Sequence, residues 1–225
     1  MILNFRHEWK HEINYCDMLI LRQRLDAVMK RDSHASGGRY LIRSLYFDNI
    51  YDKALKEKLD GVNFREKFRI RYYNGDKSFI TLEKKSKLNS LTSKEQAHLS
   101  EEEARKIVSG DIEWMKDSGR PLVQELYSKM LSEGIRPMTI VDYTREPFVY
   151  APGNVRVTLD YNIRTGLKYT NFLDWDCPTV SAGDQCCILE VKWDEYLPDI
   201  IRDAVQLPGR RVTSFSKYAV CRTYG

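Results

Sequence analysis

Apolar and polar residues alternate along much of this chain, and this pattern predicts a sheet of many strands. Successive side chains of a strand point to opposite faces, so residues at i and i+2 share one face. In Phe68-Arg69-Ile70-Arg71-Tyr72 the aromatic and aliphatic residues share one face and the two arginines share the other. Leu189-Glu190-Val191-Lys192-Trp193 shows the same separation. Each of these strands therefore has one face for packing and one that carries charge.

Turn formers and capping residues divide the alternating runs into strands and short helices. The clearest hairpin is joined by Asn74-Gly75-Asp76, because Asn-Gly is a strong turn signal. Asn14 and Ser100 are expected to cap helices. The expected strands span residues 2–12, 40–48, 63–73, 77–86, 136–149, 154–163 and 186–195, and 87–97 hold a weak strand or a loop. The expected helices span residues 15–30, 49–59, 100–108, 121–133, 198–206 and 214–222.

No internal repeat, linker or low-complexity tract separates these elements, so we expect one domain over residues 1–225. Strands of up to about 14 residues with one charged face favour a closed barrel over a sandwich, since closure removes the edges. A charged interior cannot be filled with apolar side chains, so it would hold water, ions or a ligand.

Composition narrows the class of protein. The 225 residues are 42% hydrophobic and 30% charged, which is typical of a globular protein, and the net charge is +4. No apolar run approaches the roughly 20 residues that cross a bilayer, so direct membrane insertion is not expected. The first ten residues do not resemble a secretory signal. The five cysteines are odd in number and irregularly spaced, so we expect a reducing compartment, the cytoplasm.

The charged faces indicate an anion as ligand. Arg69 and Arg71 present two guanidinium forks about 7 Å apart, a spacing that suits successive phosphates. Glu190 lies among basic residues and has two interpretations: it is a salt-bridge partner, or it holds a divalent cation that a polyphosphate also ligates. The sequence has no P-loop, no Gly-x-Gly-x-x-Gly, no His-Glu-x-x-His and no nucleophile elbow. It also lacks a ribonucleoprotein-type motif, so nucleic acid is not expected as a partner.

In its ordered series of motifs the chain resembles the polyphosphate polymerase domain of the vacuolar transporter chaperone (VTC) complex. That domain belongs to the CYTH-like triphosphate tunnel metalloenzymes. The motifs that carry the resemblance cover nearly the whole chain, and in order they are Arg6-His7-Glu8-Trp9-Lys10, Ser44-Leu45-Tyr46-Phe47-Asp48-Asn49, Phe68-Arg69-Ile70-Arg71-Tyr72, Leu82-Glu83-Lys84-Lys85, Tyr143-Thr144-Arg145, Val155-Arg156-Val157-Thr158-Leu159-Asp160, Leu189-Glu190-Val191-Lys192 and Ser216-Lys217-Tyr218.

The resemblance implies an α+β fold, an eight-stranded antiparallel β tunnel barrel with flanking and plugging helices. It implies phosphoryl transfer from ATP to inorganic polyphosphate, with Mn²⁺ or Mg²⁺ bound by Glu190. The residues that it implies as catalytic are Lys10, Arg69, Arg71, Lys85, Arg145 and Lys217. Those expected to bind substrate are Arg6, Tyr143, Arg156, Lys192 and Ser216.

Departures from the family pattern leave alternatives open. The first strand carries Glu8 and Lys10, whereas hydrolytic relatives carry Glu-x-Glu-x-Lys, which favours the polymerase branch. A tunnel triphosphatase that hydrolyses tripolyphosphate or a nucleoside triphosphate remains the enzymatic alternative. A polyphosphate- or nucleotide-binding module without turnover is the other. The roles of Glu8, Glu83 and Lys94 and the oligomeric state stay open.

Overall fold

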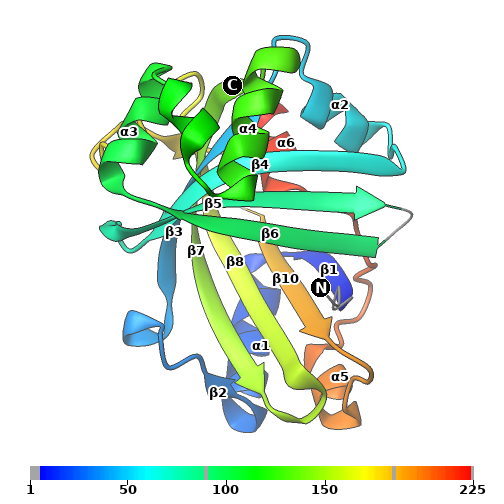
Figure 1. Ribbon diagram of the computed structural model, residues 1–225. Helices are drawn as coiled ribbons and strands as arrows, with labels where there is room; N and C mark the ends of the chain where they lie inside the picture. The colour runs from blue at the N-terminus through cyan, green and yellow to red at the C-terminus, as the bar shows by residue number, and fades with distance from the viewer. Residues whose placement is uncertain (1–5, 89–90, 184–185, 224–225) are drawn as a thin grey trace. The chain divides into compact units, whose positions relative to one another are not determined.

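The computed structural model describes residues 6–88, 91–183 and 186–223 (Figure 1). The chain divides into two compact units. The first unit contains residues 1–41, 143–163 and 181–216, and the second contains residues 42–142, 164–180 and 217–225. The expected single domain over residues 1–225 stays a prediction.

The first unit is built on strands in the hydrogen-bonded order β1-β10-β8-β7. Strands β1 and β10 pair antiparallel, as do β10 and β8. The short strand β2 pairs with the second half of β7. The elements of this unit are β1 (His7–Ile13), α1 (Tyr15–Val28), β2 (Lys30–Arg31), η1 (Ser36–Gly38), η3 (Pro152–Asn154), β10 (Cys187–Trp193) and α5 (Asp199–Val205), with most of β8 (Val155–Thr165) and half of β7 (Arg136–Tyr150).

The core of the first unit lies between helix α1 and the apolar face of its strands. Asn14 caps α1 through a reciprocal capping box with Asp17, and this fixes where the helix begins. The buried face of α1 meets the apolar residues of β10, as the alternation in the sequence predicts. The residues of this contact are Met18, Leu21, Leu25, Leu189, Val191 and Trp193. The opposite face of β10 is left to Glu190 and Lys192.

The second unit continues the strand order as β7-β3-β4-β5-β6, with antiparallel registers along β3, β4, β5 and β6. The elements of this unit are β3 (Tyr40–Asp48), α2 (Lys53–Leu59), β4 (Phe64–Tyr73), β5 (Asp76–Leu88), β6 (Leu91–Leu99), α3 (Glu101–Ser109), η2 (Glu113–Asp117), α4 (Pro121–Ser132) and α6 (Lys217–Thr223). The two-residue strand β9 (Val180–Ser181) pairs with β8.

The hairpin between β4 and β5 places the charged faces of these strands in register. Asn74 and Gly75 both have positive φ, 52° and 75°, which is the geometry of a type I′ hairpin turn. Phe68, Ile70 and Tyr72 lie in the hydrophobic core of this unit, together with residues of α3 and α4. The odd-numbered residues of β4 therefore share the opposite, polar face.

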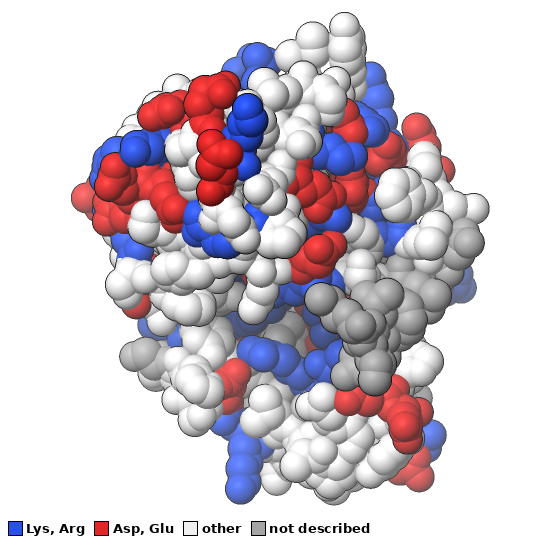
Figure 2. All heavy atoms as spheres, in the orientation of Figure 1, with Lys and Arg blue, Asp and Glu red and all other residues white. Residues whose placement is uncertain are grey.

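Charge on the outer surface of α3 and α4 is mixed in sign (Figure 2). Arg105 and Lys106 form i,i+4 ion pairs with Glu101 and Glu102 on α3. Such exposed pairs contribute little to stability. No helix among the described residues is both long enough and apolar enough to cross a membrane.

The elements agree closely with the sequence predictions. The α+β class and an antiparallel sheet with eight main strands are confirmed. Two bounds differ. The helix expected over 49–59 begins at Lys53, because the Asn49 side chain accepts hydrogen bonds from the backbone N–H groups of Tyr51 and Lys53 and forms a turn first. The uncertain segment 87–97 contains a strand, β6. Residues 2–5 of the expected strand 2–12 are outside the described residues.

Candidate functional site

The polar face of the second unit carries a dense cluster of cationic side chains, which we call the arginine cluster: Lys67, Arg69, Arg71, Lys85 and Lys94. The β4–β5 register places Arg69 opposite Glu83, and Arg71 opposite Thr81. Lys85 lies opposite Lys67 on one side and opposite Lys94 on the other. Directly opposed like charges destabilise a sheet. Three lysines in one row across β4, β5 and β6 are therefore a feature that an anion would stabilise.

Two arginines of β4, Arg69 and Arg71, are held in fixed orientations. Arg69 donates from Nε to Glu83 Oε2 at 2.7 Å and from Nη1 to the Tyr46 hydroxyl at 2.7 Å. Arg71 is almost fully buried and donates from Nε to Ser44 Oγ at 3.2 Å. The two partners Ser44 and Tyr46 come from β3, where they lie opposite Arg71 and Arg69. Because neighbouring side chains already hold the guanidinium groups, binding a ligand would cost little additional side-chain entropy.

Glu83 is the counter-charge at the centre of the arginine cluster. Its carboxylate is buried and contacts Arg69 at 2.6 Å, Arg71 at 3.8 Å and Lys94 at 2.7 Å. Burial alone would raise the pKa of Glu83, but Arg69, Arg71 and Lys94 together hold it well below its usual range. Among the described residues, the Glu83 carboxylate is thus shared by three cations.

The first unit has its own charged cluster, which we call the Glu190 cluster: Lys10, Arg145, Thr158, Asp160, Glu190 and Lys192. The register across β1, β10 and β8 places Lys10, Glu190 and Thr158 in one row. Glu190 is nearly buried and contacts Lys192 at 2.9 Å, Arg145 at 3.3 Å and Lys10 at 3.8 Å. Burial opposes the charged form, but Lys192 and Lys10 hold the pKa of Glu190 well below its usual range. Glu190 is therefore ionised.

Arg145 is oriented by a second carboxylate. It forms a bidentate pair with the fully buried Asp160, at 2.6 and 2.7 Å. Its guanidinium also lies 5.5 Å from the centre of the Tyr143 ring. Bidentate pairing fixes the plane of the guanidinium. Arg145 is thus presented next to Glu190 in a single orientation.

The remaining candidates of the first unit lie further from Glu190. The next row of the sheet contains Glu8, Lys192 and Arg156. Arg156 forms an ion pair with Asp32 at 3.1 Å. Arg6 instead pairs with Asp194 at 2.7 Å, beyond the row of His7 and Trp193. Arg6 therefore lies apart from the Glu190 cluster, and Arg156 lies at its margin.

Ser216 and Lys217 stand where the chain passes from one unit to the other. Ser216 is mostly buried, and Lys217 is the first residue of α6. The next residue, Tyr218, stacks on Tyr46 with ring centres 5.0 Å apart. The start of α6 therefore lies beside the arginine cluster within the second unit.

A divalent cation fits the oxygen groups around Glu190. Mg²⁺ and similar cations commonly take one or two protein carboxylates while substrate phosphates and water complete the shell. Glu190 supplies an ionised carboxylate. The buried Oγ1 of Thr158, opposite Glu190, has no hydrogen-bond partner among the described residues. Over the same residues, no group of three or more His, Cys, Asp or Glu side chains forms a metal cage. The donor set thus suits a cation that a phosphate also ligates.

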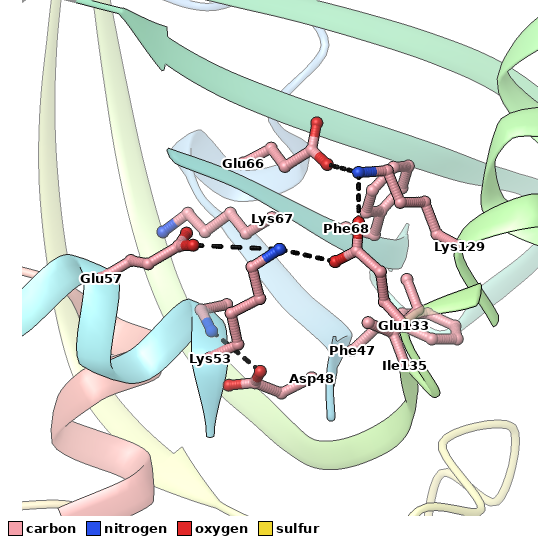
Figure 3. Close-up of a pocket in the computed structure, with 11 residues that line it drawn as sticks. Phe47, Asp48, Lys53, Glu57, Glu66, Lys67, Phe68, Lys129, Glu133 and Ile135 are labelled. Carbon is pink, nitrogen blue, oxygen red and sulfur yellow. Dashed lines mark hydrogen bonds and ion pairs between the residues drawn. The ribbon is translucent and has the colours of Figure 1, made fainter. Parts of the chain in front are cut away.

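A separate pocket of the second unit is lined by charges that already pair with one another (Figure 3). Lys53 contacts Glu133 at 2.7 Å, and Lys129 contacts Glu133 at 2.6 Å and also Glu66. The pocket holds about 30 Å³, enough for about two water molecules. It is too small for a nucleotide, so we assign it no substrate.

Sequence reasoning missed the groups that orient the cations. The sequence presents Ser44, Tyr46 and Thr158 only as parts of the family's motifs. The available signal was the period of two along β3, which puts Ser44, Tyr46 and Asp48 on one face. Which cation each of them contacts depends on the β3–β4 register, and that pairing joins segments far apart in the sequence.

A sheet with two cationic clusters, each built around a buried carboxylate, defines a protein suited to bind polyanions. The chain belongs to the VTC domain family, whose match covers residues 5–224. None of the curated proteins matches it.

Solved structures give weaker likenesses. A "putative adenylate cyclase" from Bacillus halodurans is 14% identical with a TM-score of 0.49, over 85% of this chain and 82% of that one. The PH1819 protein from Pyrococcus horikoshii OT3 is 14% identical with a TM-score of 0.44, over 89% of this chain and 84% of that one. At these scores neither likeness carries an argument about function.

Proposed function

We propose that this protein is a metal-dependent polyphosphate polymerase, which transfers the γ-phosphoryl group of ATP to a growing polyphosphate chain. One observation carries the proposal: in the arginine cluster three cations, Arg69, Arg71 and Lys94, contact one buried carboxylate, that of Glu83. Phosphoryl transfer needs chiefly positioning and charge stabilisation. Membership of the VTC domain family supports the choice of polyphosphate over other polyanions.

In this proposal Arg69 and Arg71 of β4 bind the transferred phosphoryl group. Arg69 and Arg71 present N–H groups that Glu83, Tyr46 and Ser44 already orient. Lys85, Lys94 and Lys217 add positive charge for the neighbouring phosphates. The attacking group is a terminal phosphate oxygen that is already ionised, so the reaction needs no strong general base. This agrees with a cluster that contains no histidine.

The Glu190 cluster would hold the cation and further phosphate groups. Glu190 is the proposed ligand of Mn²⁺ or Mg²⁺, and the cation would neutralise charge on the phosphates of ATP. Lys10, Arg145 and Lys192 would bind phosphate oxygens beside it, with Tyr143 and Ser216 as hydrogen-bond donors. Arg6 and Arg156 have lesser parts in this scheme, because ion pairs with Asp194 and Asp32 occupy them.

Incubation of the purified protein with ATP and Mn²⁺ tests the proposal. Long polyphosphate together with ADP is the expected result, with the polymer resolved by gel electrophoresis. Free phosphate without polymer would instead make the protein a triphosphatase. Tight binding without turnover would make it a binding module.

Two variants test the assigned roles. Glu190→Gln keeps the shape of the side chain but removes its charge, so it should abolish metal-dependent turnover, while Glu195→Gln on the exposed surface should leave turnover unchanged. The double variant Arg69→Ala with Arg71→Ala should weaken tripolyphosphate binding strongly and reduce its dependence on salt. Arg105→Ala on α3 is the matched control, because it removes an exposed arginine of the same unit. Full activity in Glu190→Gln would remove the metal assignment.

A further inference from the structure

Tyr46 lies beside the arginine cluster, and the proposed chemistry uses it only to orient Arg69. It sits on β3 directly opposite Arg69 and is only 3% exposed. Its ring stacks on Tyr218 with 24° between the ring planes. The Tyr218 hydroxyl in turn donates to Asp48 at 2.6 Å. The position of the Tyr46 hydroxyl is therefore fixed by packing on one side and by Arg69 on the other.

The Tyr46 hydroxyl accepts a hydrogen bond from Arg69 but gives none. Arg69 Nη1 donates to it at 2.7 Å. A guanidinium has no acceptor atom, so Arg69 cannot take the phenolic proton. Within the residues that the structure describes, no other group accepts that proton. A buried hydroxyl with an unused proton, next to a proposed phosphate-binding arginine, is a donor suited to an incoming anion.

The charged surroundings of Tyr46 favour its ionised form. Burial opposes ionisation, but Arg69, Lys67 and Arg71 of β4 outweigh it and lower the pKa of Tyr46 to about 7. Lys67 Nζ and the Arg69 guanidinium each lie 5.6 Å from the centre of its ring. The other titratable groups of this surrounding are Glu83 of β5, which pairs with Arg69, Tyr218 of α6, which stacks on the Tyr46 ring, and Asp48 of β3 itself, which accepts from Tyr218.

We propose that the Tyr46 hydroxyl is a further ligand of the polyphosphate anion, to which it donates its proton beside Arg69. This rests on the proposed function, because it takes polyphosphate as the anion of the arginine cluster. Above the pKa of free Tyr46, the phenolate serves as an internal counter-charge for Arg69 and Lys67. A bound phosphate replaces that charge, so in this pH range Tyr46 takes up one proton when the anion binds.

Linkage sets the direction of the pH effect. Binding requires the neutral phenol, so affinity is highest at a pH below the pKa of free Tyr46. As the pH rises above that value, each bound anion must be accompanied by one proton, and affinity falls by up to about tenfold per pH unit. The bound anion correspondingly raises the pKa of Tyr46.

Tyrosinate absorbance at 295 nm tests this directly, without turnover. The chain has 14 tyrosines, and one of them should ionise near neutral pH in the free protein. Saturating tripolyphosphate should shift that midpoint upward by about one pH unit or more. Tyr46→Phe should lack the early transition. Tyr218→Phe is the matched control, since it removes the hydroxyl from the other ring of the stack and should keep the transition.

The affinity for tripolyphosphate gives a second readout, by calorimetry in the absence of metal. At pH 6, Tyr46→Phe should bind roughly tenfold more weakly than the wild type, because one hydrogen bond to a charged group is lost. The difference should vanish near pH 8 and reverse at higher pH, since the wild type alone must then take up a proton. A constant ratio of the two affinities across this range, or an early transition that tripolyphosphate does not move, would overturn the assignment of Tyr46.

These outcomes are distinct from failure of the proposed function. If the wild type binds tripolyphosphate and forms polymer but the Tyr46 signals are absent, the inference about Tyr46 is wrong and the proposed function stands. If the wild type does not bind tripolyphosphate at all, both are wrong. Circular dichroism on each variant checks that the fold is retained.

Discussion

Replacement of Glu83 by Gln should lower the free energy of unfolding while strengthening the binding of anions to the arginine cluster. The change keeps the size of the side chain but removes the charge shared by Arg69, Arg71 and Lys94. Loss of one partner from a buried ion pair typically costs about 3–5 kcal/mol. Gln retains one oxygen acceptor, and Lys94 is 49% exposed, so we expect the lower end, about 3 kcal/mol.

The same variant should bind polyanions more tightly. Removing the carboxylate leaves three cations without their shared counter-charge, and tripolyphosphate can supply it. The free energy of unfolding is measured with urea, with and without tripolyphosphate. Glu83→Gln should regain more stability from the ligand than the wild type does. Glu101→Gln, which removes an exposed ion pair on α3, should change stability by less than about 1 kcal/mol.

The pH dependence of the free energy of unfolding gives a second test of the role of Glu83. The pKa of Glu83 is lowered in the folded protein, so its stabilising effect is present above its unfolded pKa, about 4.3. That stability is lost as the pH falls from there through the lower folded value. Glu83→Gln should therefore lose less stability on acidification than the wild type. The view that Glu83 stabilises the cluster would be refuted if the variant were as stable as the wild type at pH 7 and lost the same free energy of unfolding on acidification.

Two further predictions concern stability alone. Thr158→Val removes a buried hydroxyl that lacks a partner among the described residues, so it should raise the free energy of unfolding by up to about 1 kcal/mol in metal-free buffer. A clear loss of stability on urea denaturation would show that this hydroxyl has a partner in the folded protein. Gly75→Ala should lower the free energy of unfolding by about 1 kcal/mol, because Gly75 has a φ of 75° in the hairpin turn. An unchanged urea midpoint would contradict that turn geometry.

The alternation of apolar and polar residues allowed the strands and their buried faces to be predicted from the sequence. Phe68, Ile70 and Tyr72 could be assigned to the core, and Arg69 and Arg71 to the polar face, because the period of a strand leaves little choice. The Asn74-Gly75 turn predicted the β4–β5 hairpin itself. It did not predict that Arg69 lies opposite Glu83, because the β4–β5 register shifts between Arg71 and Tyr73.

Contacts between segments far apart in the sequence could not be predicted from this alternation. Tyr46 meets Arg69 because β3 pairs with β4, and Arg145 meets Asp160 and Glu190 from three separate strands. The chain pattern gives the face of each residue but not the neighbour across the sheet. The family resemblance supplied candidate roles for Arg145 and Glu190, while the roles of Tyr46 and Thr158 needed the register.

The lysine row also bears on how these molecules behave in concentrated solution. β6 is the last strand in the order of the second unit, and Lys94 lies on it opposite Lys85. Lysines on a terminal strand discourage the strand from pairing with another copy of the chain. A bound polyanion that neutralises the row would weaken this protection. The protein should therefore remain dispersed when free of ligand and become more prone to self-association as polyphosphate accumulates on it.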